Sequence, residues 1–445
     1  MNYSNYSKIN SESKSFSRNR RLKSFLFLLS CFGIAIYPHF IEEQVFSIIV
    51  IFISLVVATY GLVVIAKNNS NLNFVFGQGN KLKQEELPFL DILVAARDEQ
   101  NVISDLVERL FCLDYPCEKL NIYIIDDGSS DDTPTILDKL SKKFDKLNII
   151  RRLKHAGGGK SGALNYALKF ISGDWLLILD ADAQLQNDTL QKLFQFAFKD
   201  SWSVVQLRKS VSNIGKNILT NCQSIEMVMD TVFQYGRLLQ AGVSELRGNG
   251  QLIKKEVLLE CGAFNENTVT DDLDLSMRLL LAGANIGILI NPPVMEEGVE
   301  TFSALFAQRQ RWAEGGLQRF FDYWRSLLFG DISFAKRFDI LYFFILQYAL
   351  PIITLLDLLI SLFLFKKPVY WPISFTAFML SGIASWYGCN RNNEGPSLPK
   401  LTFLNLIIYL AYLSHWFVVI PWVTLKMSLL PKKILWKKTQ HKGLN

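Results

Sequence analysis

Five apolar stretches constrain this chain more than any other feature, because long uncharged segments of this kind are stable chiefly inside a lipid bilayer. They lie at residues 25–41, 45–66, 340–365, 368–388 and 401–425 of the 445-residue sequence. A helix needs about 20 apolar residues to cross a membrane. The stretches at 45–66 and 401–425 pass that length easily, whereas 25–41 is at the short limit. The sequence therefore predicts a membrane protein with spanning helices near both ends.

The first two stretches predict a transmembrane hairpin. A signal peptide is the alternative for residues 25–41, but that stretch lacks a small-residue cleavage site and a second apolar stretch follows at once. Residues 1–24 carry six basic residues against Glu12, a net charge of +5. Because basic segments favour the cytoplasmic side of a membrane, this arm is expected in the cytosol. The chain then returns to the cytosol at Lys67.

The C-terminal stretches give conflicting answers. Three spans would place residues 426–445 outside the cell, although this tail carries six lysines and no acid. The same charge rule therefore indicates that one of the three stretches is interfacial or re-entrant, and residues 368–388 are the weakest candidate. Asp357, inside the stretch at 340–365, is either a functional intramembrane acid or lies near the end of a span.

Charge and residue counts exclude several classes of protein. The chain carries a net charge of +6 and its two ends carry +5 and +6, so the remainder is at −5. This balance argues against a nucleic-acid-binding core and for basic arms at a membrane surface. The six cysteines form no C-x-x-C pair, which argues against a disulfide scaffold or a zinc ribbon. Three of the four histidines lie in or beside apolar or tail segments, so any general base should be a carboxylate.

The middle of the chain has the alternating pattern of a mostly parallel α/β sheet. Strands are expected at 91–96, 121–126 and 175–180, with helices at 101–111, 134–144 and 188–197. In open α/β sheets, ligands bind beyond the carboxyl ends of the strands. The residues directly after these strands are therefore where a functional site is expected.

Acidic pairs follow two of the expected strands. Asp126-Asp127 ends the second, and Asp180-Ala181-Asp182 follows the third. Carboxylates at neighbouring strand ends would repel one another unless a cation lies between them. Mg²⁺ or Mn²⁺ suits such a site, because these ions take oxygen ligands and usually bring a phosphate. We therefore expect a divalent metal at Asp180 and Asp182, whereas Asp131-Asp132 is better explained as a helix cap.

A glycine-rich segment, His155-Ala156-Gly157-Gly158-Gly159-Lys160-Ser161-Gly162, precedes an expected helix. A Walker A motif would require a glycine where Lys154 stands, which excludes a P-loop ATPase. Backbone amides at a helix N-terminus, together with Lys160, would still suit a diphosphate. A simple loop is the alternative.

Two further polar clusters come later in the chain. Thr270-Asp271-Asp272-Leu273-Asp274 opens a helix with more acids than a cap needs. Gln308, Arg311 and Trp312 share one helix face; an arginine can bind a leaving diphosphate and a tryptophan can stack on a sugar ring. Residues 317–329 have apolar residues at helical spacing. They are expected to form an amphipathic helix on the bilayer, with a core helix as the alternative.

Taken in order, Asp126-Asp127-Gly128, Asp180-Ala181-Asp182, Thr270-Asp271-Asp272 and Gln308-x-x-Arg311-Trp312 resemble the motifs of membrane-bound glycosyltransferase family 2. The resemblance covers about residues 91–324 and the flanking membrane helices. It implies an α/β GT-A fold, Rossmann-like with a mostly parallel sheet, and an inverting sugar transfer. Most members have Glu-Asp where this chain has Asp271-Asp272, a conservative departure because Asp272 matches the family's base.

A narrower resemblance, within that family, is to the cyanobacterial β-monoglucosyldiacylglycerol synthases. It is carried by ELRGNGQ at 245–251, TDDLDL at 270–275 and QRWAEGG at 310–316. It implies transfer of glucose from UDP-glucose to the free hydroxyl of 1,2-diacylglycerol, or of another membrane lipid, at a bilayer and without nucleic acid.

The resemblance also implies a role for each matched residue. Asp272 is expected to take the proton of the acceptor hydroxyl, and one base without a covalent intermediate gives inversion. Lys160 and Arg311 are expected to neutralise charge on the leaving UDP. The remaining expectations are a nucleotide-sugar site at Ala96, Arg97, Glu99, Asp126, Asp127, Lys160 and Asp180, Mg²⁺ or Mn²⁺ at Asp180 and Asp182, and acceptor or diphosphate contacts at Gln308, Arg311 and Trp312.

Two other functions fit part of this pattern. A processive polysaccharide synthase of the β-glucan type needs a channel, for which five or fewer spans are few. An inactive sugar-nucleotide-binding scaffold would be expected to have lost an acid or the Gln-x-x-Arg-Trp cluster, and all are present. The sequence thus favours an integral membrane glycosyltransferase of the plasma or thylakoid membrane with a cytosolic catalytic domain. The expected divisions are a basic arm at 1–24, a hairpin at 25–66, a GT-A domain at 67–316, an interface helix and linker at 317–339, membrane helices at 340–425 and a basic tail at 426–445.

Overall fold

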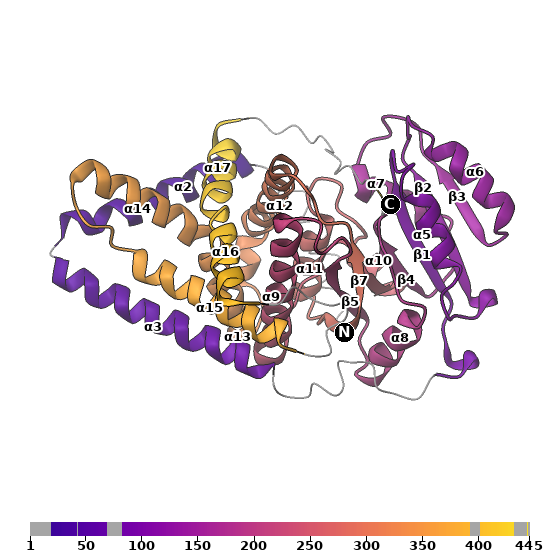
Figure 1. Cartoon of the computed structure of the whole chain (residues 1–445), viewed down its shortest axis with the longest axis horizontal. Helices are drawn as coiled ribbons and strands as arrows, with labels where there is room; N and C mark the ends of the chain where they lie inside the picture. The colour runs from indigo at the N-terminus through magenta and orange to yellow at the C-terminus, as the bar shows by residue number, and fades with distance from the viewer. Residues whose placement is uncertain (1–18, 42, 69–81, 392–400, 431–442, 444–445) are drawn as a thin grey trace.

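The computed structural model describes residues 19–41, 43–68, 82–391, 401–430 and 443. An α/β domain forms one end of the molecule, and apolar helices from both ends of the sequence form the other (Figure 1). Most of the expected basic arm at 1–24 and of the basic tail at 426–445 lies outside the described residues.

The α/β domain is built on a seven-stranded sheet in the order β3-β2-β1-β4-β6-β5-β7. Six strands run parallel, and β6 is antiparallel to both of its neighbours. The predictions at 91–96, 121–126 and 175–180 are confirmed to within one residue at each end. The strands are β1 Leu90–Ala96, β2 Leu120–Asp126, β3 Leu147–Arg151, β4 Trp175–Leu179, β5 Val204–Val211, β6 Gln251–Lys254 and β7 Gly287–Glu296.

Helices cover both faces of this sheet, so its central strands are buried on two sides, as parallel strands require. In β1, Ile92 and Val94 point into one core and Leu93 into the other. The first core is closed by α5 Ile103–Leu110, α6 Thr133–Lys143 and α8 Thr189–Lys199. The second is closed by α7 Gly159–Ala167, α10 Lys255–Glu260 and α11 Asp271–Leu281. The carboxyl ends of the parallel strands therefore meet at one edge, between the two helix layers.

Four helices in the described part of the chain are long and apolar enough to cross a membrane: Arg20–Phe40, Phe46–Lys67, Phe334–Leu364 and Phe403–Leu429. They comprise α2 Arg20–Ile36 with η1 Tyr37–Phe40, α3 Glu43–Lys67, α13 Phe334–Phe344 with η4 Ile345–Ala349 and α14 Leu350–Leu364, and α16 Phe403–Leu413 with α17 Trp416–Leu429. The stretch expected to be the weakest, 368–388, forms α15 Trp371–Cys389 and is not among the four. Four spans would return both ends of the chain to the same side, as the charge rule asks of the basic arm and the basic tail.

Asp357 lies at the middle of α14 and is fully buried. Its carboxylate accepts hydrogen bonds from the backbone N–H groups of Val369 and Tyr370 at 2.8 and 2.9 Å. The Nε2 atom of His39, in η1, lies 2.8 Å from the other oxygen. These contacts join η1, α14 and the start of α15, so the carboxylate is satisfied inside the protein as a buried acid must be.

The prediction for residues 317–329 is corrected by the structure. These residues are the second half of a single helix, α12 Phe302–Phe329, so the expected division between 316 and 317 falls inside it. Leu317, Phe320 and Phe321 are buried; Phe321 packs on Phe27 of α2, and Phe320 packs on η4 and the end of α13. Protein thus covers the first part of the apolar face, as the core-helix alternative predicts, whereas Trp324, Leu328 and Phe329 are exposed.

Two consecutive glycines let α12 pack closely on its neighbours. A Cβ atom at Gly315 would overlap the side chain of Thr270, just before α11, and one at Gly316 would overlap the hydroxyl of Tyr348 in η4. Helix α12 therefore touches the sheet domain and the membrane helices at adjacent residues.

Gly316→Ala is expected to lower the melting temperature of the detergent-solubilised protein by several degrees. Overpacking of this kind costs about 1–3 kcal/mol, because Tyr348 or the helix has to move. Gly33→Ala in α2 is the matched control, since a Cβ there meets nothing within 4 Å. Differential scanning fluorimetry of the two variants tests this packing, and equal melting temperatures for both would contradict it.

Candidate active site

A cavity of about 2080 Å³ runs from the carboxyl edge of the sheet to the membrane helices. Its sheet end is polar, and its other end is lined by η4, α15 and α17. Ten of the residues expected at the site line it: Arg97, Glu99, Asp127, Lys160, Asp180, Asp182, Asp272, Gln308, Arg311 and Trp312. The structure therefore gathers motifs from distant parts of the sequence around one space.

Ala96 and Asp126 are the two expected residues that do not line the cavity. The alternation of β1 turns Ala95 toward the cavity and buries Ala96 in the core. Asp126 instead accepts a hydrogen bond from the backbone N–H of Ser129 at 3.0 Å. The Ala96 carbonyl accepts from the Asp127 N–H at 2.9 Å, so both residues shape the loop that presents Asp127.

Asp127 is held by Arg152, which the sequence did not single out. Arg152 Nη1 lies 2.5 Å from Asp127 Oδ1, and Arg152 Nη2 donates to the Gly157 carbonyl at 2.7 Å. Burial raises the pKa of Asp127 above its ordinary value despite the guanidinium. Arg152 follows β3, a short strand with little local signal, which explains why it was missed.

The glycine-rich segment ends at the N-terminus of α7. Gly157 and Gly158 have φ values of +81° and +72°, which side chains with a Cβ rarely adopt. Lys160, in the first turn, donates to Asp180 Oδ1 at 2.5 Å and to the Gly248 carbonyl at 2.8 Å. Burial alone would lower the pKa of Lys160, but Asp180 and the nearby Asp271 and Asp272 raise it. The lysine is therefore a fixed positive charge at the sheet edge.

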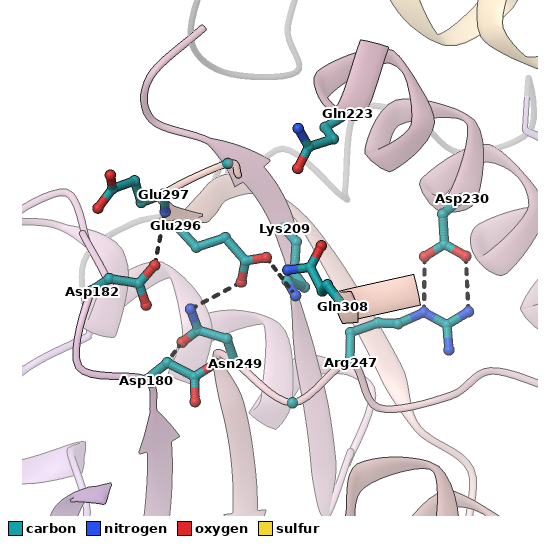
Figure 2. A network of polar contacts seen from close by, with 12 residues as sticks. Asp180, Asp182, Lys209, Gln223, Asp230, Arg247, Asn249, Glu296, Glu297 and Gln308 are labelled. Atoms are coloured by element: carbon teal, nitrogen blue, oxygen red, sulfur yellow. Dashed lines mark hydrogen bonds and ion pairs between the residues drawn. The ribbon is translucent and has the colours of Figure 1, made fainter. Parts of the chain in front are cut away.

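Around Asp180 and Asp182 lies a second layer of polar groups (Figure 2). The Asp180 N–H donates to Asn249 Oδ1 at 3.1 Å, and Asn249 Nδ2 donates to Glu296 Oε2 at 3.3 Å. Lys209 Nζ pairs with the other Glu296 oxygen at 2.7 Å. Asp182 Oδ2 accepts from the Glu297 N–H at 2.8 Å. Both metal-site candidates are thus oriented by groups on β5, β7 and the loop before β6.

Glu296 shows how strongly negative this edge is. Its pKa is raised by burial and by the Asp182 and Asp180 carboxylates, although Lys209 opposes the effect. Sequence reasoning missed Glu296, Lys209 and Asn249; the one available signal was the acid at the end of the apolar stretch that forms β7.

The donor set fits a hard divalent cation of the kind that keeps water and substrate ligands. No group of three or more His, Cys, Asp or Glu residues that could hold a metal occurs among the described residues. Mg²⁺ typically binds through one or two carboxylates together with phosphates and waters. Asp180 and Asp182, which both line the cavity, supply two oxygen ligands of this type.

Asp272 opens α11 and faces the loop at Gly248. A Cβ at Gly248 would lie 3.2 Å from Asp272 Oδ2, and the φ of +83° there also favours glycine. Burial, and then the neighbouring Asp271, raise the pKa of Asp272 to about 6, while Lys160 and Arg247 act in the opposite direction. The carboxylate is therefore a stronger base than an ordinary aspartate and is still ionised at neutral pH.

Arg247 lies next to this base and was missed as an individual residue. Its Nε and Nη2 atoms donate to both Asp230 oxygens at 2.9 and 2.8 Å (Figure 2). Its Nη1 donates to Glu245 Oε2 at 2.9 Å. Burial alone would raise the pKa of Glu245, but Arg319, Arg237 and Arg247 hold it well below its usual range. This ion-pair network fixes the loop before Gly248.

Helix α12 presents Gln308, Arg311 and Trp312 to the cavity, as their spacing predicted. Lys209 Nζ lies 5.5 Å from the centre of the Trp312 ring. Burial lowers the pKa of Arg311, but Asp180 and Asp272 oppose the shift. The arginine is therefore in the field of the same acids that surround Lys160.

A mostly parallel sheet with acids at its carboxyl edge, opening onto apolar helices, defines a membrane-associated glycosyltransferase of the GT-A class. A profile described as "Glycosyltransferase like family 2" matches residues 88–315. The chain belongs to glycosyltransferase family 2, and the prediction from its motifs is confirmed.

Individual relatives are consistent with this assignment. The β-monoglucosyldiacylglycerol synthase of Synechocystis sp. is 41% identical over 360 residues, which is 80% of this chain and 75% of the relative. That of Nostoc sp. is 40% identical over 379 residues, 84% of this chain and 81% of the relative. A Pyrobaculum calidifontis mannosyltransferase, solved with GDP-Man and Mn²⁺, shares the fold at a TM-score of 0.58 and 17% identity, covering 84% of this chain and 99% of that one.

Asp272→Asn is expected to stabilise the ligand-free protein at pH 8. The folded-state pKa of Asp272 is about 6 against an ordinary 3.8, so the folded state binds the proton more tightly than the unfolded chain does. The contribution of this group to the free energy of unfolding is fully present below about pH 4 and is lost as the pH rises through about 6. The two-unit shift corresponds to about 3 kcal/mol, and asparagine does not ionise.

Melting curves in detergent at pH 8 and pH 4.5 test this prediction. The Asp272→Asn variant should melt several degrees above the parent protein at pH 8. This difference in melting temperature should become much smaller at pH 4.5. Asp145→Asn, at an exposed position between α6 and β3, should show no gap at either pH. An Asp272→Asn variant that melts with the parent protein at pH 8 would contradict the raised pKa.

Proposed function

We propose that this protein transfers glucose from UDP-glucose to the free hydroxyl of 1,2-diacylglycerol, with inversion, to give β-monoglucosyldiacylglycerol. The observation that carries the proposal is the single cavity that joins the polar sheet edge to the apolar membrane helices. A water-soluble donor and a membrane-bound acceptor need such a space to meet. The names of the relatives at 40–41% identity support this donor–acceptor pair.

The donor nucleotide lies at the sheet end of the cavity. Arg97, Glu99 and Asp127 follow β1 and β2 and offer polar groups to the uridine. Ala96 and Asp126 act through the loop that they shape. The glycine-rich segment and the N-terminus of α7 face the diphosphate, where backbone N–H groups favour an anion.

The diphosphate lies between the acids and the cations of the sheet edge. Asp180 and Asp182 would hold Mg²⁺ or Mn²⁺, which neutralises charge on the leaving UDP. Lys160 and Arg311 add positive charge on the same side, where it stabilises the transition state more than the ground state. Asn249 and the Glu297 N–H keep the two aspartates in orientation.

The acceptor enters from the apolar end. Leu346 of η4, Phe378 of α15 and Phe417, Ile420 and Val423 of α17 line this part of the cavity and suit acyl chains. Gln308 and Trp312 lie between this end and the acids, where they frame the glycerol and the sugar.

Asp272 is the general base. Its carboxylate takes the proton from the acceptor hydroxyl, whose oxygen forms a bond to the anomeric carbon as the bond from that carbon to the UDP oxygen breaks. The attack comes from the face opposite UDP, so an α-linked donor gives a β-glucoside. A pKa of about 6 keeps the base ionised at pH 7 while making it a better proton acceptor than an ordinary aspartate.

The membrane arrangement follows from the four candidate spans. With the N-terminal arm in the cytosol, the segment after the hairpin and the tail after α17 are also cytosolic. The catalytic domain therefore faces the cytosolic pool of sugar nucleotides, at either the plasma or the thylakoid membrane.

The product of the purified protein tests the proposal. Detergent-solubilised protein with Mg²⁺, radiolabelled UDP-glucose and dioleoylglycerol is expected to give a labelled lipid that β-glucosidase cleaves, resolved by thin-layer chromatography. EDTA should stop the transfer, and Mg²⁺ or Mn²⁺ should restore it. Label at the origin without added diacylglycerol would instead identify a polysaccharide synthase. Faster transfer from UDP-galactose would correct the donor.

Asp272→Asn is expected to lower kcat at least about 100-fold, the usual contribution of a general base, with UDP affinity unchanged. For the parent protein, kcat/KM should rise with pH and reach half its plateau near pH 6, because the base has to be ionised. Asp271→Asn removes a neighbouring charge that raises the Asp272 pKa. It should therefore move this midpoint to lower pH. Near-normal turnover by Asp272→Asn would show that another group is the base.

A further inference from the structure

Arg309, inside the Gln308–Trp312 motif, is not assigned a role by the motif, yet it is among the most buried large side chains of the protein. Only 1% of the residue is exposed. Its guanidinium lies over the Trp312 ring at 4.0 Å from the centre, and its Nη1 donates to Gln308 Oε1 at 2.8 Å. It therefore contacts both residues that frame the acceptor.

The counter-charge of Arg309 comes from Glu226 in α9 Ile218–Ala241. Glu226 pairs with Arg309 Nη2 and accepts hydrogen bonds from the Tyr412 hydroxyl at 2.7 Å and the Trp416 indole N–H at 3.1 Å. Burial alone would raise the pKa of Glu226, but Arg309 and these donors lower it, so the carboxylate is ionised. We call Glu226, Arg309, Tyr412 and Trp416 the Glu226 cluster.

The cluster joins the acceptor site to a candidate membrane span. Tyr412 belongs to α16, and Trp416 begins α17. The Arg309 guanidinium lies 4.0 Å from the ring centre of Trp312 and 5.8 Å from that of Trp416. A planar guanidinium fixes the plane of a ring that it stacks on, which an ammonium does not.

Stability alone does not account for this arrangement. A buried ion pair is often no more stabilising than apolar side chains of similar volume, because both charges lose their hydration. What it does supply is orientation. Because a guanidinium only donates, the Gln308 amide has to turn its oxygen toward Arg309, and its NH2 group faces away from the arginine.

We propose that Glu226 and Arg309 are positioning residues for the acceptor. They hold Gln308 and Trp312 in the orientation that binds the acceptor, and they make that orientation depend on the position of α16 and α17. This inference rests on the proposed function in that the acceptor is a membrane lipid. The donor groups on the sheet edge have partners outside the cluster, since Asp127 pairs with Arg152 and Asp180 pairs with Lys160. Loss of the cluster should therefore affect the acceptor and spare the nucleotide.

Three variants and one matched control test the proposal. Arg309→Lys keeps the charge and loses the planar stack, Glu226→Gln keeps the shape and loses the charge, and Tyr412→Phe is the mildest change to the cluster. Tyr409→Phe is the control, because Tyr409 lies one turn away on α16 and its hydroxyl bonds to Met229 Sδ at 3.2 Å rather than to Glu226.

The first readout is kinetic. Arg309→Lys should raise the KM for diacylglycerol about tenfold and Tyr412→Phe about threefold, as expected for the loss of one stacking or hydrogen-bonding interaction. The dissociation constant for UDP should stay within about twofold in all variants. Tyr409→Phe should match the parent protein in its KM for diacylglycerol and in its dissociation constant for UDP. A parallel fall in UDP affinity, or an unchanged acceptor KM in Arg309→Lys, would overturn the proposal.

The second readout does not depend on the acceptor. The protein has nine tryptophans, and labelling with 5-fluorotryptophan gives each a ¹⁹F resonance, with Trp312 assigned by Trp312→Phe. The Trp312 resonance should move in the three cluster variants and stay in place in Tyr409→Phe. An unmoved Trp312 resonance in Arg309→Lys would refute the positioning role. If the parent protein fails to glucosylate diacylglycerol, the proposed function fails, and this resonance alone decides the inference.

Discussion

The accumulation of carboxylates at one edge of the sheet is the constraint on which the rest of the structure depends. Asp180 and Asp182 follow β4, Glu296 ends β7 and Asp272 opens α11, and all four line the same cavity. So much negative charge is tolerated only where cations face it. Lys160 pairs with Asp180, and Lys209 pairs with Glu296. The same cations are available to a diphosphate, so a bound sugar nucleotide would replace these carboxylates with phosphate oxygens as the partners of the two lysines.

Helix α12 connects this charged edge to the membrane helices. Its first half carries the residues that face the cavity, and its second half packs on α2, η4 and α17. Gly315 packs against Thr270, just before α11, and Gly316 packs against Tyr348 in the π-helical turn η4. Adjacent residues of α12 therefore contact the start of α11 and the membrane helices. Helix α12 is therefore one continuous connection between the membrane helices and the cavity-lining residues Gln308 and Trp312.

The sequence predicted what depends on local pattern. Short apolar runs located β1, β2 and β4, and the acids after them lay where sheet topology requires. It missed Arg152, Lys209 and Glu226, because each contributes through a partner far away in the chain and carries no local signature, and it missed Glu296 because β7 was not among the predicted strands. Ala96 was chosen where Ala95 faces the cavity, since a shift of one residue in a strand exchanges its two faces. The pattern at 317–329 left two interpretations open for a related reason: apolar residues at helical spacing mark a face that avoids water but do not say whether lipid or protein covers it.

The opening of the cavity toward the apolar helices has a consequence for the membrane itself. For an acceptor that enters from within the bilayer, the effective concentration is its mole fraction in the leaflet. The rate of turnover therefore depends on the lipid composition of one leaflet and not on a concentration in the cell volume. The larger sugar-bearing headgroup is made on the side where the donor is dissolved, and flipping such a headgroup across the hydrocarbon layer is slow. An enzyme of this architecture therefore builds lipid asymmetry as it works, and the shape of that leaflet changes with each turnover.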